Sequence, residues 1–189
     1  MKSASKFILL LAILLSVSCK PSPQKAEDYY DQISLPVKNV LVKEDKLIQI
    51  INADTVKDKK GASILKKLES EPSFGKHKEL DLAYNNFKMQ ITTSLNTLKQ
   101  IPDFDNKAVL KNTAIALLNT YDSIAQNEYA QLITITKIPA SQYTNANDDK
   151  LLELTEIIDN KLQVRISAFT KEVKLFASDY KFKLAKDSI

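Results

Sequence analysis

The stretch "LLELTEIIDNKLQVRISAFTKEVKLFASDY", residues 151–180, decides the fold. Its apolar side chains recur in steps of three and four residues, at Leu151, Leu154, Ile158, Leu162, Ile166, Phe169, Val173, Phe176 and Tyr180. That spacing places them on one face of an α-helix. A helix with a single apolar face cannot bury it alone, so the stretch predicts partner helices.

Three earlier segments carry the same period and supply those partners. Their apolar stripes run through 29–51, 80–98 and 110–135, and breaks at 71–79, 101–106 and 138–149 separate them. Four amphipathic helices with short connections predict an all-α, antiparallel four-helix bundle. The composition agrees, because two glycines in 189 residues are too few for the turns of an all-β fold.

Two helix boundaries are open to interpretation in these segments. Pro36 falls inside the first stripe, where it either kinks the helix or marks its first turn with Ser34 as the cap. Asn145 or Asn147 is expected to cap the last helix.

The N-terminus indicates export. A basic opening, MKSASK, precedes nine apolar residues at 7–15, whereas a membrane-spanning helix needs about 20. This length is typical of the apolar region of a secretory signal peptide. Ser16 and Ser18 precede Cys19 and satisfy an ordinary signal peptidase. The same residues resemble a bacterial lipobox, although Ser16 stands where leucine is usual.

Cys19 is the only cysteine, so a secreted chain cannot use it for an internal disulfide. Acylation gives the lone thiol a use, and three acyl chains would anchor the protein permanently. We therefore expect a lipoprotein signal peptide over 1–18, a flexible tether over 19–26 with lipidated Cys19, and one helical-bundle domain over 27–189.

The composition excludes several chemistries. One histidine cannot supply a di-iron site, which needs two Glu-x-x-His pairs, or a two-histidine zinc site. One cysteine excludes a dithiol redox pair, and two glycines exclude a glycine-rich phosphate loop. No catalytic residue, metal or cofactor is expected. Loss of residues 1–18 lowers the formal net charge from +4 to +2, which does not indicate nucleic-acid binding.

Three charged residues lie on or beside the apolar stripes: Glu44, Glu128 and Arg165, the only arginine. One interpretation is a buried cluster that fixes helix register. A second is the polar end of a small ligand pocket. A third is that the long side chains reach solvent at the edge of the bundle.

The C-terminal helix is basic. Residues 161–189 have a net charge of +4 from Lys161, Arg165, Lys171, Lys174, Lys181, Lys183 and Lys186 against three acidic residues. Such a run of charge is usually a solvated helix face, and the second interpretation is a surface that meets a protein or anionic partner.

The order of these parts resembles an uncharacterised family of small helical surface or periplasmic lipoproteins of diderm bacteria. The residues that carry the resemblance are Tyr29, Tyr30, Pro102, Phe104, Tyr121, Asn127, Glu128 and Tyr129. It implies a helical bundle at the outer membrane, facing the surface or the periplasm, and it brings no active site. We expect a non-enzymatic envelope protein that binds a macromolecule or supports an assembly. The alternatives are a small-ligand carrier or sensor and an enzyme of unrecognised type.

Overall fold

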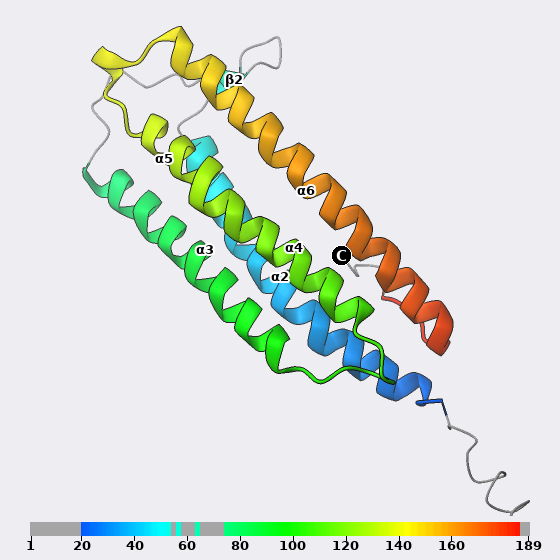
Figure 1. The fold of residues 1–189 in the computed structure, drawn as a ribbon. Coiled ribbons are helices and arrows are strands. Elements are labelled where there is room, and N and C mark those ends of the chain that lie inside the picture. The colour runs from blue at the N-terminus through cyan, green and yellow to red at the C-terminus, as the bar shows by residue number, and fades with distance from the viewer. Residues whose placement is uncertain (1–19, 54–55, 58–62, 65–73, 186–189) are drawn as a thin grey trace, which may run out of the picture.

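The computed structural model describes residues 20–53, 56–57, 63–64 and 74–185. The predicted signal peptide and Cys19 lie outside the described residues. Four long helical rods form an antiparallel bundle (Figure 1), which confirms the predicted fold class. The rods are α2 (Pro23–Ala53), α3 (Phe74–Gln100), the continuous run of α4 (Val109–Ile124), η1 (Ala125–Tyr129) and α5 (Ala130–Thr136), and α6 (Asn145–Tyr180).

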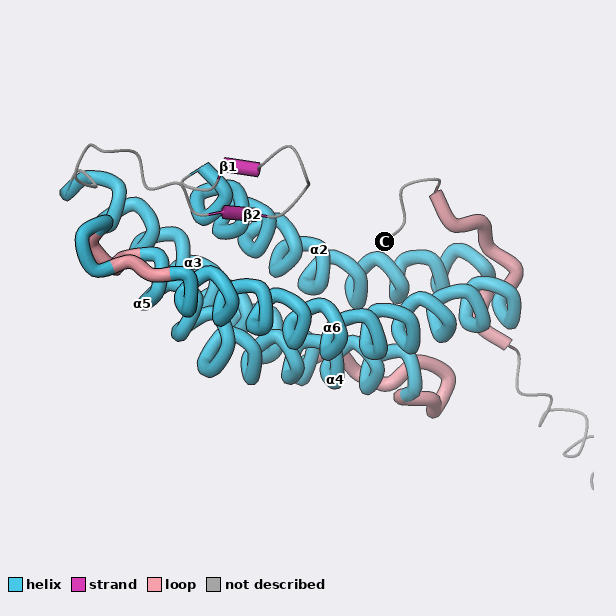
Figure 2. Tube along the Cα trace, turned by 90° about the horizontal axis from the view of Figure 1, so that it is seen from above, coloured by secondary structure: helices cyan, strands magenta, loops and turns pink. Residues whose placement is uncertain are grey.

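Short elements connect the rods at the two ends of the bundle. Strands β1 (Val56–Lys57) and β2 (Ser63–Ile64) pair antiparallel between α2 and α3, and the 3₁₀ turn η2 (Ala140–Gln142) precedes α6. The loop before α4 and the tail after α6 lie at the opposite end, beside the start of α2 (Figure 2). The two-residue strands were not expected from the sequence.

Helix α2 begins earlier than predicted. Proline is favoured in the first turn of a helix, and Pro23 occupies that place. The Lys25 amide donates to Ser22 Oγ at 3.4 Å, and the Ala26 amide donates to the Ser22 carbonyl at 3.1 Å. The flexible tether expected over 19–26 is therefore wrong from Pro23 onward, because Ser22 and Pro23 together start a helix there.

Pro36 lies inside α2, and Ser34 does not cap a helix. The Ser34 hydroxyl donates instead to the Asp31 carbonyl at 3.3 Å. The Pro36 carbonyl accepts a buried hydrogen bond of 2.9 Å from Ser94 Oγ of α3. This bond joins the two helices at the proline.

Helix α6 has well-defined ends. Its N-cap is Thr144, whose amide donates to Asn147 Oδ1 at 2.8 Å, so Asn145 and Asn147 both stand inside the first turn and neither is the cap. The chain leaves the helix through Lys181 in the left-handed conformation (φ 59°), and the Phe182 amide donates to the Ala177 carbonyl.

One hydrophobic core runs the length of the bundle. At the end where α2 begins, Phe104 stacks on Tyr29 with ring centroids 4.9 Å apart and contacts Phe176 and Tyr180 edge-on. No helix among the described residues is long and apolar enough to cross a membrane. Within the described part of the chain, Glu44 and Glu128 are the only charged residues in the buried class.

Candidate functional site

Glu44 is one of the two buried charged residues in the described part of the chain. It lies on the inner face of α2 and is 7% exposed. Its Oε2 accepts a hydrogen bond from the Tyr121 hydroxyl of α4, and its Oε1 accepts one from the Tyr129 hydroxyl of η1, both at 2.9 Å. The Phe87 ring packs edge-on against both tyrosine rings. Two hydrogen bonds from the α4–η1 run, whose tyrosine rings pack against Phe87 of α3, therefore fix the Glu44 carboxylate.

The π-helix η1 brings the two tyrosines to the same face. Residues eight apart in an α-helix are offset by about 80° around its axis. A π-turn inserts one extra residue, so Tyr129 takes the place that a residue seven positions after Tyr121 would occupy, about 20° away. The wider turn is what places both hydroxyl groups on one carboxylate.

Side-chain donors support the backbone of this wider turn. The Tyr84 hydroxyl of α3 donates to the Ala125 carbonyl at 2.7 Å. Asn127 Nδ2 donates to the Ser123 carbonyl at 2.7 Å, and Gln131 Nε2 donates to the Asn127 carbonyl at 3.3 Å. Such π-turns occur frequently at functional sites, and this one carries Tyr129, a hydrogen-bond donor to Glu44.

The electrostatics of the site centre on the Glu44 carboxyl group, which has no cationic partner among the described residues. Burial raises the pKa of Glu44, while the two tyrosine hydrogen bonds act in the opposite direction and the charges of Asp159 and Asp45 add to the increase. Burial and the adjacent carboxylate raise the pKa of both Tyr121 and Tyr129, so both remain hydrogen-bond donors. No ion pair to Glu44 forms among the described residues.

An open groove of about 470 Å³ runs past Glu44 between α2 and α6, and we call it the α2–α6 groove. Leu41 and Ile48 form its α2 wall. Its α6 wall combines apolar and polar side chains, namely Ile158, Asp159, Asn160, Leu162, Gln163 and Ile166. Glu44 and its two tyrosines form the floor. A mainly apolar cleft with a few polar groups is the usual form of a small-molecule site.

The three charged residues predicted to cluster do not meet. Glu44 binds the two tyrosines, whereas Glu128 Oε1 accepts a 2.7 Å hydrogen bond from Lys161. Arg165 is exposed on α6, and the described residues give it no hydrogen bond or ion pair to either carboxylate. The Glu44–Glu128–Arg165 cluster is therefore wrong, because Arg165 lies beside the buried stripe of α6 and its side chain remains in solvent.

Glu128 forms a separate pair. Its side chain is 10% exposed and that of Lys161 is 43% exposed, and Glu128 Oε2 is buried with no hydrogen-bond partner in the described part of the chain. The lysine therefore neutralises a carboxylate that has little water around it. This pair joins η1 to α6.

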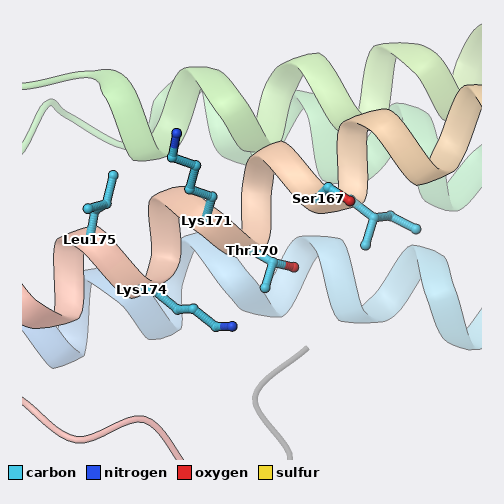
Figure 3. A pocket seen from close by; sticks show the side chains of 6 residues that line it. Ser167, Thr170, Lys171, Lys174 and Leu175 are labelled. Carbon is cyan, nitrogen blue, oxygen red and sulfur yellow. The ribbon is translucent and has the colours of Figure 1, made fainter.

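A second pocket of about 490 Å³ lies along the C-terminal half of α6, and its described lining comes from that helix alone. Lys171 and Leu175 point to one side of the helix, whereas Lys174 points to the other (Figure 3). The two ammonium groups do not converge on one point, so this surface does not present a built site for a single anion.

The sequence does not predict the role of two residues at the site, Tyr129 and Asp159. Tyr129 stands outside the predicted stripe, because its spacing from Tyr121 fits an α-helix poorly. Asp159 lies next to Ile158 on α6 and has no distinguishing motif. No group of three potential metal ligands exists among the described residues.

Comparisons of the chain with family models, with curated proteins and with solved structures find no match. The resemblance to small helical lipoproteins therefore stays a prediction.

Proposed function

We propose that this protein is a non-enzymatic, lipid-anchored binding protein of the outer membrane that holds a small ligand in the α2–α6 groove. The observation that carries the proposal is the position of Glu44, a buried carboxylate at the floor of an open and mainly apolar cleft. A carboxylate buried without an ionic partner is costly to ionise, and a bound ligand gives that arrangement a use.

The remaining parts of the proposal come from the sequence. Cys19 behind a short apolar segment supports acylation and export. A single histidine and a single cysteine in the chain support a binding role over catalysis. Among the alternatives, the geometry favours the ligand carrier or sensor over a purely structural lipoprotein.

Native mass spectrometry of the full-length protein purified from its own membranes tests the binding role. We expect a bound mass beyond the acyl chains of Cys19. Ile166→Trp fills the α2–α6 groove and should remove that mass. Val164→Trp is the matched control, because Val164 is 66% exposed and does not line the groove. No bound mass in wild type, or equal mass in Ile166→Trp, contradicts the proposal.

An anionic membrane surface is the second candidate partner, and the observation that favours it is the exposed basic surface of α6. Lys171 and Lys174 lie beside Leu175, which is 49% exposed. Co-sedimentation of the Cys19→Ala chain with phosphatidylglycerol vesicles, compared with phosphatidylcholine vesicles, tests an anionic surface. The double variant Lys171→Glu/Lys174→Glu should abolish a specific interaction. Equal sedimentation with both lipids contradicts this candidate.

A further inference from the structure

We infer that the ligand of the α2–α6 groove is a small organic cation, an aliphatic ammonium compound whose charged end meets Glu44 and Asp159 and whose apolar part lies along the groove. This inference rests on the proposed binding function and specifies its ligand class. It is carried by the charges, the hydrogen bonds and the walls of the groove.

The charge of the groove is one-sided. Two carboxylates, Glu44 and Asp159, line it, and the described lining contains no lysine, arginine or histidine. Lys161, which follows the lining residue Asn160 on α6, is already bound to Glu128. An anionic ligand would face repulsion from both carboxylates, whereas a cation would supply the counter-charge that the fold leaves out.

The hydrogen bonds of Glu44 leave room for one more donor group. Each carboxylate oxygen has two lone-pair sites, and each accepts one tyrosine hydroxyl in the structure. The tyrosines hold the carboxylate in place from the core side. An ammonium group donates up to three hydrogen bonds and can approach the remaining sites from the groove.

The apolar walls determine the rest of the ligand. Leu41 and Ile48 on α2 face Leu162 and Ile166 on α6 across a space of about 470 Å³. This volume falls within the usual range of small-molecule sites, about 300–1,000 Å³. An alkyl chain on the ammonium would remove these side chains from water, which an inorganic cation cannot do.

A tryptophan reporter tests the inference, because the chain contains no tryptophan of its own. Ile48 is 37% exposed, so Ile48→Trp places the fluorophore at the rim and leaves the groove open, whereas less exposed Ile166 is the site of the blocking variant. Val42→Trp places the fluorophore on an exposed part of the same helix. The full-length protein in nonionic detergent is titrated with hexylammonium, hexanol and hexanoate, three probes of one length and different charge. A fluorescence change that appears with both reporters arises from partition of the probe into the detergent micelle.

We expect hexylammonium to change the Ile48→Trp signal alone and to bind at least about 10-fold more tightly than hexanol or hexanoate, as a charge-assisted hydrogen bond implies. Adding Glu44→Gln should weaken hexylammonium about 10- to 100-fold, whereas Glu156→Gln at an exposed position of α6 should not. If Glu44→Gln fails to fold, exposed Asp159→Asn serves instead and should weaken binding about threefold or more.

The outcomes separate the two proposals. Equal or tighter binding of hexanol or hexanoate overturns the cation inference while the groove still binds ligands. A bound native mass together with no response to any probe also overturns the inference and leaves the binding function standing. No probe response and no native mass overturn both.

Discussion

Tyr121 and Tyr129 lie eight residues apart in one helical rod, and yet their hydroxyl groups donate to the two oxygens of a single carboxylate, that of Glu44. The π-helix η1 between them makes this possible, because its extra residue rotates Tyr129 onto the face of Tyr121. The buried anion, the wider turn and the aromatic pair therefore form one unit, and each can be perturbed separately.

Tyr129→Phe should destabilise the protein by about 1.5–3 kcal/mol at neutral pH, because a hydrogen bond to a charged group is lost. Urea unfolding measures the change. Tyr84→Phe is the matched control, since its hydroxyl donates to a neutral carbonyl and should contribute about 0.5–1.5 kcal/mol. An effect of Tyr129→Phe no larger than that of the control would mean that Glu44 does not bear charge in the folded protein.

Glu44→Gln should change the pH dependence of stability. The folded-state pKa of Glu44 is raised by burial, so the folded protein holds this proton more tightly than the unfolded chain does. The stability gained from that proton is present at acidic pH and is lost as pH rises through the raised pKa. The free energy of unfolding of the variant, relative to wild type, should therefore increase from pH 4 to pH 8.

Urea unfolding across that range, with Glu156→Gln as a surface control, checks the prediction. A relative stability that falls with increasing pH would show that the tyrosine hydrogen bonds outweigh burial and lower the pKa of Glu44.

Deletion of Gln126, an exposed residue of η1, should be tolerated. Removing the extra residue converts the π-turn to an ordinary α-helix and keeps Tyr121 and Tyr129 on one face. Deletion of exposed Asn119 in α4 should instead rotate the residues on one side of the deletion by about 100° relative to those on the other. Buried side chains such as Tyr121 would then leave the core, and the free energy of unfolding should fall by about 3 kcal/mol or more. Thermal unfolding compares the two, and equal losses would show that η1 does not set the register.

Lys161→Met should destabilise the protein by about 1–3 kcal/mol at neutral pH, because it leaves the Glu128 carboxylate buried without a cation. Lys150→Met breaks the exposed pair with Glu153 on the same helix and should cost less than about 1 kcal/mol. Combining Lys161→Met with Glu128→Gln should restore most of the loss. An absence of this rescue would contradict the pairing.

Cys19→Ala should release the protein from the membrane. Metabolic labelling with an alkyne fatty acid should mark wild type and not the variant, and membrane fractionation should move the variant to the soluble fraction if signal cleavage continues. Protease treatment of intact cells then shows which side of the outer membrane wild type occupies. Unchanged labelling or fractionation in Cys19→Ala would contradict acylation at this residue.

The sequence predicted the helices and their inner faces well, because hydrophobic periodicity depends on local geometry alone. Glu44 and Glu128 were placed on those faces, and both are buried. The sequence does not predict the partners of these two residues. A stripe of apolar residues indicates which way a side chain faces, but not which residue of another helix lies opposite it. Arg165 is grouped with Glu44 and Glu128 only because it lies beside the apolar stripe of the last helix. In the structure the hydrogen-bond donors are Tyr121 and Tyr129 for Glu44, and Lys161 for Glu128.

The π-helix limited the prediction in a second way. A constant period of 3.6 residues places Tyr129 off the buried face, and a single inserted residue is invisible to a window that assumes that period. In the structure, adjacent buried pairs recur every four residues through η1 and α5: Ile124 with Ala125, Glu128 with Tyr129, and Leu132 with Ile133. Two competing stripes in one segment were the available signal.

The early start of α2 has a mechanical consequence. Only Lys20, Pro21 and Ser22 separate Cys19 from the rigid rod, and four extended residue steps reach at most about 14 Å. Glu44 stands 21 positions along the helix from Pro23, which is about 30 Å of rise. If Cys19 is acylated as proposed, the short connection and the stiff helix limit how far the groove can lie from the membrane. The groove then meets only those ligands that come within about 45 Å of the bilayer.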